Sequence, residues 1–224
     1  MRIADNVEML RIEAHGTHHP VLTWDDDDVV LIDTSYPGEL AALRAEVARC
    51  GFALEQITKV ILTHQDVDHI GNARILRGYG AHVLAGEHEV AFIQGDQPLT
   101  KLTDMAGELD MTPERRAFYE VFATAAPQVV VEVDLALSHG QSLDLVGGIE
   151  VVFTPGHTPG HIVLRLVKHD IVVCGDAANI VDGQMVGSFP ELTHDQAQAD
   201  ASLERIRELA AGTYLTYHQG CWRA

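Results

Sequence analysis

The sequence predicts an α/β fold, and three of its features support this prediction. Apolar and polar residues alternate with a period of two over residues 2–13 and 20–25, which is typical of half-buried strands. Residues 60–62 form a short, wholly apolar segment of the kind that is buried on both faces of a sheet. Between residues 29 and 85, strand-like and helix-like segments follow one another. This order favours helices layered on a sheet.

Local signals define the elements of the first half. Asp25–Asp28 reads as a solvated hairpin turn, because it lacks the alternating ligands and the glycine of a calcium-binding loop. Leu40, Leu43 and Val47 recur at helical spacing, and Gly51 is expected to end that helix. The expected elements are a strand at 29–33, a helix at 38–50, a strand at 60–62, a helix at 69–78 and a strand at 81–85.

Residues 92–127 interrupt this rhythm and are predicted to form a helical insertion. Thr112-Pro113-Glu114 is a good start for a helix that runs to about Ala125. Two interpretations stay open, a helical pair with its own small core or a wall of the substrate pocket. Both depend on the apolar side chains of the segment, which are Phe92, Met105, Met111, Phe118, Tyr119 and Phe122.

Strand patterns return in the second half. Gly147-Gly148 and His169-Asp170 are predicted hairpin turns. Thr193 and Gln196 have the spacing of a capping box. The expected elements are strands at 128–137, 142–154, 162–167 and 170–174, a helix at 194–211 and a strand at 214–217. The chain shows no repeat or linker, so we expect a single domain over residues 1–224.

Composition restricts the partners. Fifteen Lys and Arg against 33 Asp and Glu give a net charge of −18, which disfavours nucleic acid. No apolar run reaches the ~20 residues that span a membrane, and the N-terminus lacks the apolar region of a secretion signal. Cys50, Cys174 and Cys221 do not form a disulfide framework. We therefore expect a cytoplasmic protein with a small-molecule substrate and no membrane or nucleic-acid partner, and a homodimer is left open.

The densest group of potential metal ligands follows the apolar segment 60–62. It contains His64, Asp66, Asp68 and His69, and it precedes the predicted helix 69–78. Ligands of α/β proteins gather at the carboxyl ends of strands, where this group is expected to lie. One metal ion with a water would not use all four side chains, so the sequence indicates two ions.

Three further candidate ligands also follow predicted strands. His157 lies in the turn-rich segment 154–161, Asp176 comes after the strand at 170–174, and His218 comes after the last strand. Each of these residues alone would be weak support for a metal site.

In this order, these residues resemble the metallo-β-lactamase-fold superfamily, from Asp33 in Leu31-Ile32-Asp33-Thr34 to His218. The resemblance implies a four-layered αβ/βα sandwich with two metal ions along one edge, most often zinc. It implies that Asp176 bridges the ions and that Asp33 supports the site from behind. The implied ligands are His64, Asp66 and His157 for the first ion, and Asp68, His69 and His218 for the second. His161 has no ligand role in the family and is expected to be structural.

Asp66 departs from the family pattern, which has histidine there. A carboxylate makes the first position harder and favours iron or manganese more than imidazole does. With Asp66, Asp68 and Asp176, two divalent ions and a bridging hydroxide, the site would be neutral. The flavodiiron branch of the superfamily also has a carboxylate here, but a glutamate. Whether the shorter Asp66 binds the ion directly is left open.

The resemblance implies a binuclear metal-dependent hydrolase that uses a metal-bridging hydroxide. Asp68, or Asp66 if it does not bind metal, would orient the water and pass its proton to the leaving group. A chain of this size suits a small ester, lactone or thioester. Two alternatives stay open, a non-haem di-iron redox protein, which Asp66 motivates, and a non-catalytic metal-binding protein.

Overall fold

Two sheets form the centre of the computed structural model, which describes residues 1–13, 15–106, 108 and 110–224. The first sheet is mixed, and its strands β6, β7 and β8 are parallel to one another. In spatial order its strands are β1 (Arg2–Ala4), β2 (Val7–Met9), β5 (Val21–Trp24), β6 (Val29–Ile32), β7 (Lys59–Leu62), β8 (His82–Gly86) and β9 (Leu135–Leu137).

The second sheet is mainly antiparallel, with one parallel pair between β13 and β16. In spatial order its strands are β10 (Ser142–Leu143), β11 (Ile149–Phe153), β12 (Ile162–Leu166), β13 (Ile171–Val173), β16 (Thr213–Thr216) and β17 (Gly220–Arg223). Two small hairpins complete the strands, β3 (Ile12–Glu13) with β4 (Thr17–His18), and β14 (Ala178–Val181) with β15 (Gln184–Gly187).

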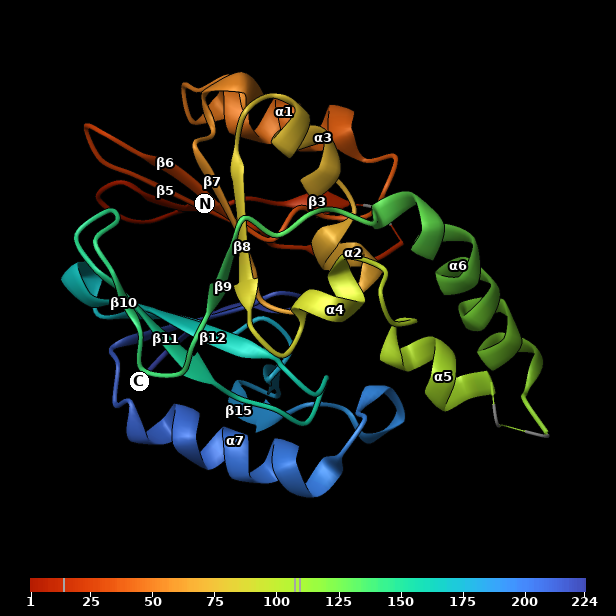
Figure 1. Ribbon diagram of the computed structural model, residues 1–224. Coiled ribbons are helices and arrows are strands. Elements are labelled where there is room, and N and C mark those ends of the chain that lie inside the picture. Colours follow the sequence, from red (N-terminus) through yellow and green to blue (C-terminus); the bar gives the residue numbers. More distant parts are fainter. Residues whose placement is uncertain (14, 107, 109) are drawn as a thin grey trace.

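Helices cover the outer faces of both sheets (Figure 1). Helices α1 (Leu40–Arg49) and α3 (Ala73–Gly78) lie over the first sheet, and α7 (Gln196–Glu208) lies over the second. The predicted α/β fold with αβ/βα layers is therefore confirmed. The other helices are α2 (Val67–Ile70), α4 (Val90–Ile93), α5 (Thr100–Ala106) and α6 (Pro113–Val129), with single 3₁₀ turns at Leu54–Gln56, Val167–His169 and Pro190–Leu192.

Strand β6 and residues 60–62 of β7 are wholly apolar because alternate side chains of each strand enter two different cores. Val30 and Ile32 of β6 point into the core between the sheets, whereas Val29 and Leu31 point into the core beneath the helices. Ile61 of β7 likewise joins the inter-sheet core, and its neighbours Val60 and Leu62 join the other. Because both faces are covered, each side chain removes apolar surface from water at ~25 cal/mol per Å². These central strands fix the edge where the site is built.

The helical insertion contributes to the same core. Phe122, Ala125 and Val129 of α6 are buried against the first sheet and its helices, with Phe92 and Phe118 packed beside them. Phe122 is only 2% exposed. Phe92, Phe118 and Phe122 therefore pack in the core of the first sheet, whereas another face of α6 is exposed.

Several predicted boundaries were wrong. The strand expected at 128–137 is only β9, because α6 continues past Pro127 to bury Val129. The long strand expected at 2–13 is divided into β1, β2 and β3, with Asn6 in the left-handed region between the first two. Helix α7 is capped by Asp195, which accepts the Gln198 N–H, and not by the predicted Thr193. The strands β14, β15 and β17 were not predicted.

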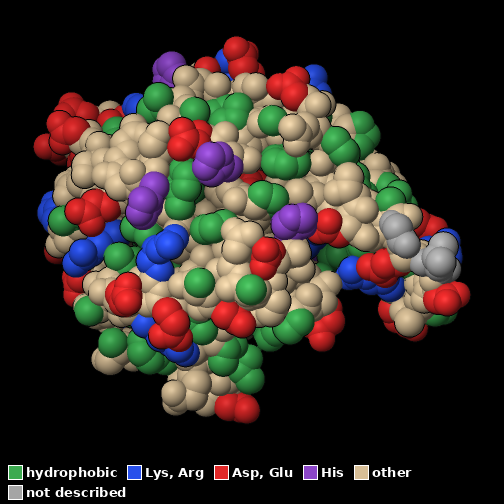
Figure 2. Space-filling view, turned by 60° about the horizontal axis from the view of Figure 1, so that its bottom comes forward, with side chains coloured by type: hydrophobic (Ala, Val, Ile, Leu, Met, Phe, Trp, Pro, Cys, Tyr) green, Lys and Arg blue, Asp and Glu red, His purple; other side chains and the backbone are tan. Residues whose placement is uncertain are grey.

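Acidic side chains are spread over the face of the molecule in Figure 2, with Lys and Arg side chains between them. Histidine side chains also appear on this face. The 13 histidines of the chain therefore include surface residues as well as buried ones. His15, His82, His88, His139 and His194 are exposed, whereas five others are buried. Among the described residues, no helix is both long enough and apolar enough to cross a membrane.

Candidate metal centre

The candidate ligands meet where strands of both sheets end. The segment Thr63–His69 leaves the carboxyl end of β7 and enters α2. His157 lies in the loop between β11 and β12, Asp176 follows β13, and His218 lies in the turn between β16 and β17. Carboxyl ends of parallel strands lie at the same edge, which is why segments far apart in the sequence converge here.

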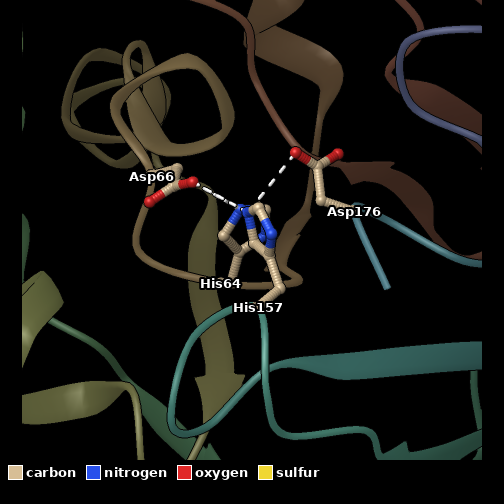
Figure 3. A group of neighbouring side chains, drawn as sticks. All are labelled: His64, Asp66, His157 and Asp176. Carbon is tan, nitrogen blue, oxygen red and sulfur yellow. Dashed lines mark hydrogen bonds and ion pairs between the residues drawn. The ribbon is translucent and has the colours of Figure 1, made fainter. Parts of the chain in front are cut away.

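One group consists of His64, Asp66, His157 and Asp176, which we call the first group (Figure 3). One donor atom from each residue lies within 4.8 Å of the others, and all four residues are buried. Asp66 Oδ2 lies 3.2 Å from His64 Nε2 and 3.0 Å from His157 Nε2. Asp176 Oδ2 lies 3.5 Å from His157 Nε2. The side chains point toward a common centre.

A second group contains His69, Asp68, Asp176 and His218. Asp176 Oδ1 lies 3.5 Å from His69 Nε2, and its Oδ2 lies 3.3 Å from His218 Nε2. Asp68 Oδ2 lies 3.5 Å from His218 Nε2 and 3.8 Å from His69 Nε2. Asp176 therefore belongs to both groups and stands between them. The seven residues singled out in the sequence are brought together in two adjoining sets.

Asp33 holds the motif from behind. Its carboxylate accepts the backbone N–H and the hydroxyl of Thr63, at 2.9 and 2.8 Å, and the Nδ1–H of His69 at 2.8 Å. With its hydroxyl donated to Asp33, Thr63 accepts the Nδ1–H of His64 at 3.0 Å. Both imidazoles therefore carry their proton on Nδ1, which leaves the Nε2 atoms for a metal ion.

Imidazole Nε2 atoms and carboxylate oxygens, the donor atoms of both groups, are suited to bind divalent metal ions. His64 Nε2, His69 Nε2, Asp66 Oδ1 and Asp176 Oδ1 are buried, and within the described part of the chain none of them makes a hydrogen bond. Buried polar atoms without partners are costly, and ion coordination would satisfy them. Burial and neighbouring histidines hold the pKa of His64 well below its ordinary value. Burial and Lys101 do the same for the pKa of His157. Neutral imidazole is the form that binds metal.

Charges in the second group are strongly coupled. Burial alone would lower the pKa of His69, but Asp33, Asp176 and Asp68 raise it well above its usual value. The pKa of His218 is raised in the same way by Asp176, against the effect of burial. Burial raises the pKa of Asp68, whereas His218 and His69 outweigh burial and lower that of Asp176. A metal ion bound here would replace the Nε2 proton of each imidazole.

The loop before Asp176 depends on a glycine. Gly175 has a φ of +51°, and a Cβ at this position would lie 2.7 Å from His161 Nε2 and 2.8 Å from Thr63 Oγ1. His161 is engaged on both sides of its ring, by the Thr154 hydroxyl at 3.0 Å and the Asp176 N–H at 3.1 Å. His161 thus holds the backbone that presents Asp176.

Two residues at the site were not predicted as ligands or site groups. His18, from the β3–β4 hairpin, is buried with Nε2 3.8 Å from Asp68 Oδ2, and burial lowers its pKa to about 3. Lys101 of α5 is buried in the first group, where its ammonium contacts Asp66 Oδ2 and lies 2.9 Å from His157 Nε2. Burial lowers the pKa of Lys101 to about 7. Neither residue belongs to a motif singled out in the sequence, although His18 stands beside a second histidine, His19.

The chain belongs to the metallo-beta-lactamase superfamily, whose family model matches residues 16–218. The probable metallo-hydrolase YflN of Bacillus subtilis is 26% identical over 235 residues, covering 96% of this chain and 84% of YflN. A hydroxyacylglutathione hydrolase of Acidiphilium cryptum is 36% identical over only 74 residues, 32% of this chain and 30% of its own. Matches to three curated relatives span between 56% and 84% of the relative's length.

Solved structures support the same fold. The metallo-beta-lactamase family protein TTHA1429 of Thermus thermophilus aligns with a TM-score of 0.79 at 22% identity. The alignment covers 99% of this chain and 76% of that protein. At this identity, the likeness establishes the fold of the chain and not its substrate.

Proposed function

We propose that the protein is a hydrolase that uses two divalent metal ions to activate water against a small carboxylic ester, lactone or thioester. The observation that carries the proposal is the convergence of two His/Asp groups that share Asp176 and are buried except for His218. Membership of the superfamily and relatives named as probable metallo-hydrolases support it.

The residues divide between two ion positions. His64, Asp66 and His157 would hold the first ion, Asp68, His69 and His218 the second, and Asp176 would contact both. Ions bound there would lower the pKa of a water and polarise the substrate carbonyl. The carboxylate at Asp66 makes iron or manganese an alternative to zinc at the first position.

Asp68 is the better placed of the two candidate proton carriers. Its backbone is fixed by Tyr217, whose hydroxyl donates to the Asp68 carbonyl at 2.7 Å and accepts the Ser35 N–H at 3.1 Å. The Asp68 carboxylate lies 3.5 Å from His218 Nε2 and 3.8 Å from His69 Nε2, beside the second ion position, where it would take a proton from the attacking water and return it to the leaving group. Asp66 Oδ2 lies within 3.2 Å of both His64 Nε2 and His157 Nε2, so as a ligand of the first ion it would be less free for this role.

The substrate would enter along α6. A groove of about 540 Å³ lies between the exposed face of α6 and the loops that carry His15 and Tyr36. The Tyr36 ring lies 5.1 Å from the ring of His18, which in turn approaches Asp68. Tyr36 and His18 therefore lie between the groove and Asp68 of the second group. The similarity to a hydroxyacylglutathione hydrolase supports an acyl compound as substrate.

The test is a panel of esters, lactones, thioesters and phosphoesters assayed on zinc-reconstituted protein, with Asp68→Asn as the variant. We expect turnover of an acyl substrate, and a loss in kcat of about 10²–10⁴-fold in Asp68→Asn when both proteins are compared at equal zinc content. Asp144→Asn, at an exposed position, is the matched control.

Other outcomes would contradict the proposal. Metal-loaded protein that cleaves no member of the panel would favour a non-catalytic metal-binding protein. Bound iron with a visible absorption spectrum that changes on reduction would favour the di-iron redox alternative.

A further inference from the structure

Lys101 reaches the first group because α5 is anchored to the metal-binding motif. The side-chain carbonyl of Gln65, in the middle of the motif, accepts the backbone N–H of Thr100 at 2.7 Å. Both residues are buried, and Thr100 is the first residue of α5. The next residue, Lys101, is therefore directed between Asp66 and His157, and it is only 7% exposed.

The ammonium of Lys101 lies among atoms that would bind the first ion. It contacts Asp66 Oδ2 and His157 Nε2, and these two atoms are themselves 3.0 Å apart. An ion bound to the same atoms would lie next to a like charge in a buried site, where repulsion is poorly screened. The ammonium and the ion therefore exclude each other.

We propose that Lys101 is a built-in cation of the first group, which a metal ion can enter only by displacing it. The proposal rests on the proposed metal centre and makes its two positions unequal. The second group, which Lys101 does not contact, binds its ion first. The first position binds more weakly because the ion must replace an existing ion pair.

The structure offers a place for the displaced ammonium. A small cavity beside Lys101 is also lined by Asp104, Glu191 and Arg115. Asp104 lies three residues after Lys101 on α5, and Glu191 comes from the 3₁₀ turn Pro190–Leu192. Asp104 already pairs with His194 at 2.9 Å. The ammonium that leaves Asp66 would therefore share this carboxylate with His194 or pair with Glu191. Metal loading would thus rearrange the start of α5.

The experiment is a zinc titration of chelator-stripped protein by calorimetry, comparing wild type with Lys101→Met. We expect two binding steps in wild type. In Lys101→Met, the weaker step should strengthen at least about tenfold, whereas the stronger step changes less than about threefold. Lys168→Met, at an exposed position, is the matched control and should bind as wild type does. In His218→Ala the stronger step should be lost, which assigns it to the second group.

The outcomes separate this proposal from the proposed function. Two steps that are unchanged in Lys101→Met would overturn the role of Lys101 and leave the metal centre intact. Folded wild-type protein that binds no zinc would overturn the metal centre itself. Lys101→Gln, a second uncharged variant, replaces Lys101→Met in the comparison if circular dichroism shows that the latter is not folded.

Discussion

The Asp33 carboxylate accepts a hydrogen bond from Nδ1 of His69 at 2.8 Å. It also accepts hydrogen bonds from the backbone N–H and the hydroxyl of Thr63. Asp33 lies at the end of β6 with a φ of +61°, and Thr63 lies at the end of the neighbouring β7. One buried carboxylate thus connects two strand ends and fixes the ring of a proposed ligand. It is a positioning residue for the second group.

Removing this carboxylate should weaken metal binding at the second group. For Asp33→Ala we expect a loss in zinc affinity of about 10–100-fold, because His69 loses the partner that orients its ring. Asp33→Asn keeps an acceptor oxygen and should lose less. Competition with a chromophoric chelator measures both, with Asp27→Asn on the exposed turn as control. Unchanged affinity in Asp33→Ala would contradict the positioning role.

Asp66 and Lys101 should also be coupled in the stability of the metal-free protein. Truncating one member of a buried ion pair leaves the other unpaired, so Asp66→Ala should lower the free energy of unfolding by about 3–5 kcal/mol. The double variant Asp66→Ala/Lys101→Met should lose less than the sum of the single variants. Urea unfolding measures all three. As control, Glu204→Ala breaks an exposed pair with Arg207 and should cost less than about 1 kcal/mol. Strict additivity would show that the pair is not coupled.

The groove along α6 can be narrowed without touching the metal groups. Ala117 lies in the groove, so Ala117→Trp should raise KM for bulky acyl substrates more than for small ones and leave zinc content unchanged. Ala123→Trp, at an exposed position of the same helix outside the groove lining, is the matched control. Identical substrate preference in both variants would remove the groove from the substrate path.

Glu89 should make stability depend on pH. Its buried carboxyl accepts the Gly160 N–H at 2.6 Å, and burial raises its pKa from 4.5 to about 7. Between these values the folded protein holds the proton more tightly than the unfolded chain does. The contribution of Glu89 to stability is therefore greatest below pH 4.5 and is lost as the pH rises toward 7.

As the pH rises from 4.5 to about 7, Glu89 lowers the free energy of unfolding by about 3 kcal/mol, at roughly 1.4 kcal/mol per pH unit. Glu89→Gln should remove this loss, so that the variant gains stability relative to wild type on going from pH 5 to pH 8. Urea unfolding at both pH values measures the difference, with exposed Glu87→Gln as control. If the free energy of unfolding changes between pH 5 and pH 8 by the same amount in Glu89→Gln as in wild type, Glu89 is not the cause of the pH dependence.

The sequence was sufficient to predict the layers and the strand ends where the candidate ligands lie. The reason is that Val60-Ile61-Leu62 must be covered on both faces, and a polar residue directly after such a strand has only the sheet edge to occupy. His157, Asp176 and His218 likewise lie in the loops that follow β11, β13 and β16.

Lys101 could not be predicted, because its place depends on one tertiary contact, from Gln65 to Thr100. No spacing in the sequence relates residue 65 to residue 100. His18 had only a neighbouring histidine as a signal, and its burial comes from packing against Tyr36 and Tyr217. The end of α6 was misjudged for a similar reason, since the burial of Val129 outweighs the proline two residues before it.

The most direct test of the metal centre is the number of ions bound per chain after equilibrium dialysis against excess zinc, measured by elemental analysis. We expect two ions in wild type and a large loss of both in Asp176→Asn, because Asp176 lies between the two groups. Folded wild-type protein without bound metal would contradict the proposed metal centre. An Asp176→Asn variant that keeps both ions as tightly as wild type would contradict the shared role of Asp176.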